Sequence, residues 1–241
     1  MSNPKPPAKK ESLLLNLVCN IAVPTLVLTK LSDEKYLGAQ WGIVVALIFP
    51  LGYGVYDLVQ RKKANLFSIV GVVSVLLTGI LNQLKADVFW FAVKEAAMPT
   101  LLGAALLVSM KTKRPLVREL LWNDHVIDTA KVEAALDARG HRADFDRQLG
   151  LANYGMAASF LLSAVLNYGL ARYLLKDSPG TTAFNEQLGR MNFLSWPVIV
   201  LPTMIVTILV FWKLLSGLTH LSGLTLDEAM HQPPPKKEPK A

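Results

Sequence analysis

Residues 88–109 read VFWFAVKEAAMPTLLGAALLVS. The stretch has about the ~20 residues that an α-helix needs to cross the hydrocarbon core of a membrane. Apart from Lys94 and Glu95 it carries no charged side chain. It therefore predicts a membrane-spanning helix with two charged residues inside it.

Five more apolar stretches of similar length accompany this one. The six are Leu13–Thr29, Ala39–Tyr56, Leu66–Leu84, Val88–Ser109, Leu151–Leu175 and Phe193–Leu215. The chain is 241 residues long and 52% hydrophobic, and its apolar residues gather in these long runs, which argues against a soluble core. We expect an all-α polytopic membrane protein, a bundle of six transmembrane helices with a cytoplasmic helical insertion between helices four and five.

The positive charges are distributed unevenly around these six spans. If all six cross the membrane, 18 of the 25 Lys and Arg residues lie on one side and six on the other, and Lys94 lies inside a span. Lys and Arg concentrate on the cytoplasmic side of membrane proteins. We therefore expect a multi-pass membrane protein with both termini cytoplasmic. Trp212 would mark the inner end of the last span, because indole rings favour the interface.

The spans divide the chain into a membrane domain and flanking segments. Residues 1–12 are predicted to form a cytoplasmic tail, and residues 13–215 the six-helix domain with a cytoplasmic insertion at 111–150. Residues 216–241 are predicted to form a cytoplasmic, partly disordered tail, since 233–241 is rich in Pro and Lys. Within the insertion, residues 116–149 have a helical pattern. This segment either lies on an anionic membrane surface or forms a helical hairpin packed on the bundle.

Four of the six spans contain proline, which removes a backbone donor and bends a helix. The candidate helix breaks are Pro24, Pro50 with Gly52 and Gly54, Pro99, Pro197 and Pro202. Packing-driven kinks of this kind are common in membrane bundles. The alternative is a discontinuous helix that lines a binding site. The first interpretation is favoured, because proline is frequent in membrane helices.

Two spans carry matching polar stripes. Residues 74–82 read SVLLTGILN and residues 159–167 read SFLLSAVLN. A spacing of four residues places Ser74, Thr78 and Asn82 on one helix face, and the same holds for Ser159, Ser163 and Asn167. Such stripes are either hydrogen-bonding contacts between packed helices or a polar wall of a translocation path, and the first is the more common.

Lys94 and Glu95 are the sharpest candidates for a functional site. A charged residue inside a membrane helix is costly and suggests function. Neighbouring residues point about 100° apart on a helix, so the two side chains need not pair. Lys94 can also extend its ammonium to the outer interface. Glu95 is too short for that, and it either takes up protons or pairs with another helix.

Several other functions find no support in the sequence. No nucleotide-binding loop, hydrolase motif or metal-ligand spacing is present, so we expect no enzyme, no cofactor and no metal site. The net charge of +7 is explained by topology and anionic lipid, and no nucleic acid partner is expected.

Intramembrane amides such as Asn153 each need a hydrogen-bond partner in lipid.

Several motifs together resemble one family. They include PLGYGVYDLVQRKKANLFSIVG at 50–71, KEAAMPTLL at 94–102, KTKRPLVREL at 111–120 and SPGTTAFNEQLGRM at 178–191. In this order they resemble an uncharacterised family of bacterial inner-membrane proteins, whose members are loosely labelled MFS transporter or intracellular septation protein A-like. Six spans are too few for a full major-facilitator fold of twelve helices. The resemblance carries no active-site residue to this chain.

Two functions follow as hypotheses. The first is a transporter-like protein for a small solute or an ion, in which transport is either coupled to protons or independent of them. Glu95 and the two stripes would line the translocation path. The second is a non-enzymatic scaffold of the cell envelope or of septation that contacts other envelope proteins or a second copy of itself. The lipid bilayer is a partner in both. Intramembrane charge beside a proline slightly favours the first.

Overall fold

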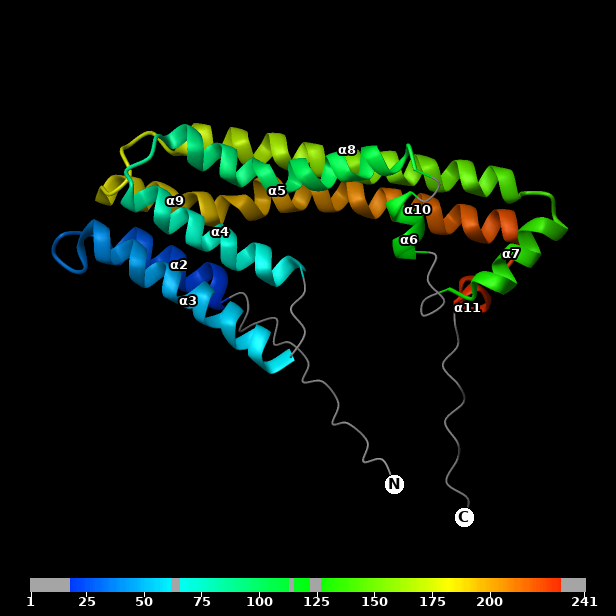
Figure 1. Ribbon diagram of the computed structural model, residues 1–241, viewed down its shortest axis with the longest axis horizontal. Helices are drawn as coiled ribbons and strands as arrows, with labels where there is room; N and C mark the ends of the chain where they lie inside the picture. Colours follow the sequence, from blue (N-terminus) through cyan, green and yellow to red (C-terminus); the bar gives the residue numbers. More distant parts are fainter. Residues whose placement is uncertain (1–17, 62–65, 113–114, 122–126, 231–241) are drawn as a thin grey trace, which may run out of the picture. The chain divides into compact units, whose positions relative to one another are not determined.

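A computed structural model describes residues 18–61, 66–112, 115–121 and 127–230 of the chain. Within these residues the regular structure is helical, and the one β-pairing is an isolated bridge between Ile127 and Met230. The elements, three of them short π-helical segments (η), are η1 (Val18–Ala22), α2 (Val23–Leu26), η2 (Val27–Leu31), α3 (Gly38–Arg61), α4 (Leu66–Gln83), α5 (Val88–Ser109), α6 (Leu116–Leu121), α7 (Thr129–Ala138), α8 (Arg142–Leu174), α9 (Thr182–Ser195), η3 (Trp196–Val200), α10 (Leu201–Ser222) and α11 (Leu226–Ala229) (Figure 1). The all-α prediction is confirmed.

Four helical segments of the described chain are long and apolar enough to cross a membrane. They are Gly38–Tyr56, Val88–Ser109, Arg142–Leu174 and Thr182–Ser222. They overlap the second, fourth, fifth and sixth predicted spans. Val88–Ser109 has the bounds predicted for the fourth span. The first and third spans correspond to shorter apolar helices, Val18–Leu31 and Val72–Gln83. The coarser prediction of several helices long and apolar enough to cross a membrane is confirmed, and the count of six stays a prediction.

These helices expose large apolar side chains along much of their length. On α10, Ile205 and Ile208 are more than half exposed, and so is Trp212. Soluble proteins seldom expose contiguous apolar surface on this scale. The exposed faces are consistent with insertion into lipid.

The chain divides into two compact units, each with its own core. The first comprises residues 1–97 and 165–200, and the second comprises residues 98–164 and 201–241. In the first unit, η2, α3 and α9 pack together around Leu28, Ile43 and Phe184, all of which are essentially buried. The rings of Phe91 and Phe184 meet edge to face, with their centroids 4.9 Å apart, an arrangement that aromatic pairs favour.

The second unit explains what the insertion between the fourth and fifth spans does. Val132 and Leu136 of α7 are fully buried, and they share a core with Leu214 and Leu218 of α10. Figure 1 shows α7 beside the C-terminal end of α10. The apolar face of α7 is therefore covered by protein. This favours the packed interpretation of residues 116–149 over a helix lying on the membrane surface.

Two predicted boundaries differ from the structure in this unit. Helix α8 begins at Arg142, inside the predicted insertion 111–150, and continues without a break to Leu174. Helix α10 ends at Ser222 and not at residue 215. Beyond it, α11 packs against α7, and the amide of Asp128 donates a hydrogen bond to the carbonyl of Ala229 at 2.9 Å. The predicted tail at 1–12, and residues 231–241 of the predicted tail at 216–241, lie outside the described residues.

The prolines divide into two groups. Helix α3 runs unbroken past Pro50, Gly52 and Gly54, and α5 runs unbroken past Pro99, so neither helix is discontinuous at these candidate positions, in line with the favoured interpretation. A spanning helix tolerates a missing amide donor without unwinding when neighbouring groups satisfy the freed carbonyl.

The remaining prolines accompany altered helical geometry. Pro24 lies in the four-residue α2, between the π-helical segments η1 and η2. Pro197 lies within the π-helical η3, and Pro202 lies in the first turn of α10. A π-turn widens the backbone where the proline ring would otherwise clash with the preceding turn. The helix changes pitch at these points without ending.

Candidate functional site

The ammonium of Lys94 is held inside the first unit by three side chains. Its Nζ donates to Thr78 Oγ1 at 2.8 Å and to Ser74 Oγ at 3.3 Å, and it lies 2.8 Å from Glu95 Oε1. The Lys94 side chain is only 9% exposed. It therefore does not extend to an outer interface. It turns from α5 toward α4 and ties the two helices together.

The polar stripe of α4 is built to receive this cation. Thr78 Oγ1 donates its own proton to the carbonyl of Ser74 at 3.0 Å. That bond leaves the oxygen lone pairs free to accept from Lys94. Ser74 and Thr78 lie on the same face, one turn apart, because the helix repeats every 3.6 residues. Two hydroxyl acceptors thus meet one ammonium, and this part of the predicted polar site is brought together.

Glu95 completes the charge balance of the site. Neighbouring side chains diverge on a helix, yet the long Lys94 chain brings its ammonium back to the Glu95 carboxylate. The pair is neutral overall, and the hydroxyls of Ser74 and Thr78 satisfy further protons of the ammonium. This arrangement offsets part of the cost of removing two charges from water. Glu95 is 25% exposed, more than Lys94, so its carboxylate is the more accessible member of the pair.

Asn82 follows two turns after Ser74 on α4 and adds an open acceptor. It is 4% exposed, and its Oδ1 has no hydrogen-bond partner among the described residues. A buried polar atom left in this state costs free energy, so it is a natural contact for a bound molecule. Asn82 shares a helix face with Ser74 and Thr78 through its spacing.

Ser159 of the second stripe serves helix packing in the second unit. Ser159 of α8 donates to the carbonyl of Thr203 at 3.1 Å, and its hydroxyl lies 3.1 Å from that of Thr207. A Cβ on Gly155 would lie 2.6 Å from Val210, so α8 and α10 approach closely here. Small residues and cross-helix hydroxyls are the ordinary means of packing helices in lipid. The packing interpretation therefore fits Ser159.

The other two members of this stripe, Ser163 and Asn167, lie in different units. Ser163 and Asn167 are half-buried on α8. Ser163 belongs to the second unit and Asn167 to the first.

Two buried asparagines, one in each unit, form hydrogen bonds between segments that are far apart in the sequence. Asn153 is fully buried and satisfies the expectation that it needs partners, because its Nδ2 donates to the carbonyl of Leu106 at 2.7 Å and its Oδ1 accepts from the amide of Val117 at 3.2 Å. Asn185 was not expected. Its Nδ2 donates to the carbonyl of Ala39 at 2.7 Å and to Ser32 Oγ at 3.2 Å.

Asn185 lies in the connection between the fifth and sixth predicted spans, where the apolar pattern predicts no helix. The available signal was Thr181, whose side chain accepts from the amide of Phe184 and begins α9. A threonine N-cap followed by buried residues at helical spacing predicts a helix. Its apolar positions Phe184 and Leu188 are buried.

Among the described residues, no group of three or more His, Cys, Asp or Glu side chains is placed to hold a metal ion. Comparison with known proteins returned no matching family model, no matching curated protein and no matching solved structure.

Proposed function

We propose that this chain is an integral protein of a bacterial cytoplasmic membrane that moves a small solute or an ion. Four long apolar helices support insertion. The excess of Lys and Arg on one side of the predicted spans supports cytoplasmic termini. The resemblance of its motifs to inner-membrane proteins labelled as transporters agrees with this proposal.

The observation that carries the proposal is the Lys94–Glu95 pair with its two hydroxyl partners. A buried ion pair contributes little net stability compared with well-packed apolar residues, so stability alone does not explain why it is there. Charged residues within membrane helices are typical of substrate and proton pathways. The adjacent Asn82 adds a buried acceptor without a partner.

Glu95 is the proposed switch of this site. When its carboxylate accepts a proton, Lys94 loses its counter-ion and keeps the hydroxyls of Ser74 and Thr78. The ammonium is then free to bind an anionic or strongly polar group. When the proton leaves, the ion pair forms again and displaces that group. Binding and proton transfer are coupled in this way without a metal or a cofactor.

The test is transport by the purified full-length chain in liposomes. Currents on a solid-supported membrane are recorded after concentration jumps of protons, Na⁺, K⁺ and a panel of amino acids, sugars and organic anions. We expect a current for at least one of these, reduced at least tenfold in Glu95→Gln. Glu34→Gln is the control, because Glu34 is exposed and outside the pair. No current for any probe, or equal currents in Glu95→Gln and wild type, contradicts the proposal.

The second candidate is a membrane scaffold of the cell envelope. The contacts of Ser159 and Asn153 favour it, because both side chains are used in helix packing. The septation label of the resembling family points the same way. Crosslinking in intact cells distinguishes the two. A scaffold yields stable adducts with envelope proteins that persist in Glu95→Gln, together with no transport current.

A further inference from the structure

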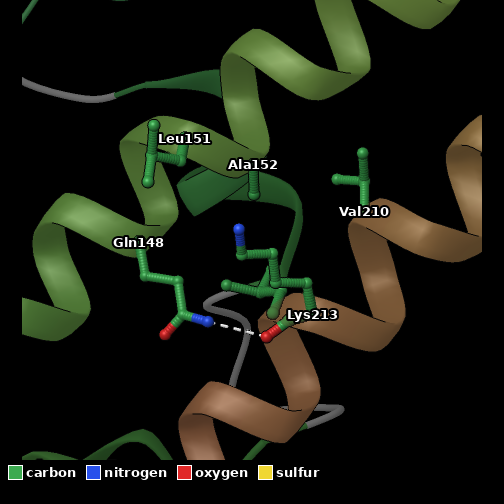
Figure 2. A pocket seen from close by; sticks show the side chains of 6 residues that line it. Gln148, Leu151, Ala152, Val210 and Lys213 are labelled. Carbon is green, nitrogen blue, oxygen red and sulfur yellow. Dashed lines mark hydrogen bonds between the residues drawn. The ribbon is translucent and has the colours of Figure 1, made fainter.

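A groove between α8 and α10 of the second unit has a mixed lining. Its volume is about 210 Å³, and it is lined by Gln148, Leu151, Ala152, Val210, Lys213 and Leu214 (Figure 2). Four of the six are apolar, and a single positive charge, that of Lys213, is among them. Its lining is therefore amphipathic: an apolar trough with one cationic group.

The polar end of the groove is fixed by Gln148. Its Nε2 donates to the backbone carbonyl of Lys213 at 2.6 Å, as the dashed line in Figure 2 shows. Gly217 makes room for this amide, because a Cβ there would overlap the Gln148 side chain. The backbone at Lys213 is thus held against α8.

The ammonium of Lys213 is available to a ligand. In Figure 2 the Lys213 side chain extends along the groove in the direction of Ala152. Within the described part of the chain it forms neither an ion pair nor a hydrogen bond through its ammonium. Two arginines of this unit, by contrast, form ion pairs: Arg118 with Asp146 and Arg142 with Glu133.

The depth of the groove suits a lipid. Trp212, next to Lys213, is 68% exposed, and indole rings favour the interface between the hydrocarbon core and the headgroups. By the charge asymmetry of the chain, this end of the last span faces the cytoplasm. Anionic lipids are abundant in that leaflet, and basic pockets between helices there bind their headgroups.

We propose that this groove is a binding site for an anionic phospholipid. One acyl chain lies against Leu151, Val210 and Leu214, and the phosphate pairs with Lys213. Charge complementarity selects the headgroup, and the apolar walls require a chain attached to it. The proposal is independent of the Lys94–Glu95 site.

Native mass spectrometry of the full-length chain in a neutral detergent tests the proposal. The protein is titrated with phosphatidylglycerol or phosphatidylcholine carrying identical acyl chains. We expect wild type to bind one phosphatidylglycerol more tightly than any other, with about fivefold weaker binding in Lys213→Gln. Lys111→Gln is the matched control, since Lys111 is also an exposed lysine at the inner end of a predicted span, and its affinity should stay within twofold of wild type.

Further variants distinguish the contribution of the lipid headgroup charge from that of its acyl chain. Leu151→Phe, a change at an exposed position that fills the groove, should weaken the tightest phosphatidylglycerol site while leaving Lys213 in place. Lys213→Arg should retain binding, which controls for misfolding of the glutamine variant. Three outcomes overturn the proposal. They are equal losses in Lys213→Gln and Lys111→Gln, phosphatidylcholine binding as tightly as phosphatidylglycerol, or full competition by free glycerol phosphate.

Discussion

Replacing Thr78 with valine tests whether the Lys94 site exists as described. The change keeps the shape of the side chain and removes one hydroxyl. Thr78 is 7% exposed, so water does not replace the lost acceptor for Lys94. A hydrogen bond to a charged group contributes about 1.5–3 kcal/mol in soluble proteins, whereas bonds between membrane helices average about 0.6 kcal/mol and reach about 1.7. Because Lys94 retains Ser74 and Glu95, we expect a loss of about 1 kcal/mol.

The cause of that loss is isolated by a double-mutant cycle with Lys94→Met. In the methionine background Thr78→Val removes only the bond to the carbonyl of Ser74, and its cost should fall to a few tenths of a kcal/mol. Thr29→Val is the matched control, since the Thr29 hydroxyl donates at 2.8 Å to the carbonyl four residues earlier in its own helix and to no charged group. The control should cost the same in both backgrounds.

The assay is reversible unfolding of the purified chain in mixed micelles with a denaturing detergent, followed by helical circular dichroism. The expected cost of about 1 kcal/mol in the wild-type background corresponds to roughly a fivefold change in the unfolding equilibrium constant. An equal cost of Thr78→Val with and without Lys94 would refute the contact between the two side chains.

Three further predictions concern stability. Gly42→Ala should destabilise the chain by about 1–3 kcal/mol in thermal unfolding, because a Cβ there would overlap the Ser32 side chain; Gly52→Ala, with open space around it, should not. Asn153→Leu should cost about 1–3 kcal/mol, because it leaves the buried amide of Val117 without a partner and removes one of the two donors to the carbonyl of Leu106, which keeps the hydroxyl of Ser109; it should also speed amide exchange in α6. Hydrogen bonds from the backbone and hydroxyl of Thr225 lower the pKa of Glu228. This stabilisation is present above the unfolded pKa of the carboxyl group and is lost as the pH falls through its lowered folded pKa. At neutral pH, amides of α11 should therefore exchange more slowly in wild type than in Glu228→Gln. At acid pH this difference between the two proteins should disappear.

The long apolar helices could be predicted from the sequence, because a run of about 20 apolar residues is typical of a segment whose backbone satisfies its own hydrogen bonds as a helix. Residues 88–109 form a helix with the predicted ends for this reason. The ends of α8 and α10 could not be predicted in this way. Residues 142–150 and 216–222 continue their helices with many polar side chains, and a search for apolar runs does not detect such a continuation.

The candidate site was predictable in residue type but not in pairing. Ser74 and Thr78 share a face by spacing alone, and Lys94 is conspicuous inside an apolar run. That Lys94 reaches these hydroxyls depends on which helices pack together, and one chain's periodicity does not contain that information. Asn185 was missed for a related reason, because its partners Ser32 and Ala39 lie 153 and 146 residues away along the chain.

The most direct test of the account is proton movement into liposomes that contain the purified chain. A pH-sensitive dye is enclosed, a membrane potential is imposed, and uptake is compared with and without the solute that gives a current for wild type. The account predicts solute-dependent proton uptake in wild type and in Glu34→Gln, and none above the protein-free background in Glu95→Gln. Proton uptake that is unchanged in Glu95→Gln would contradict the role assigned to the Lys94–Glu95 pair.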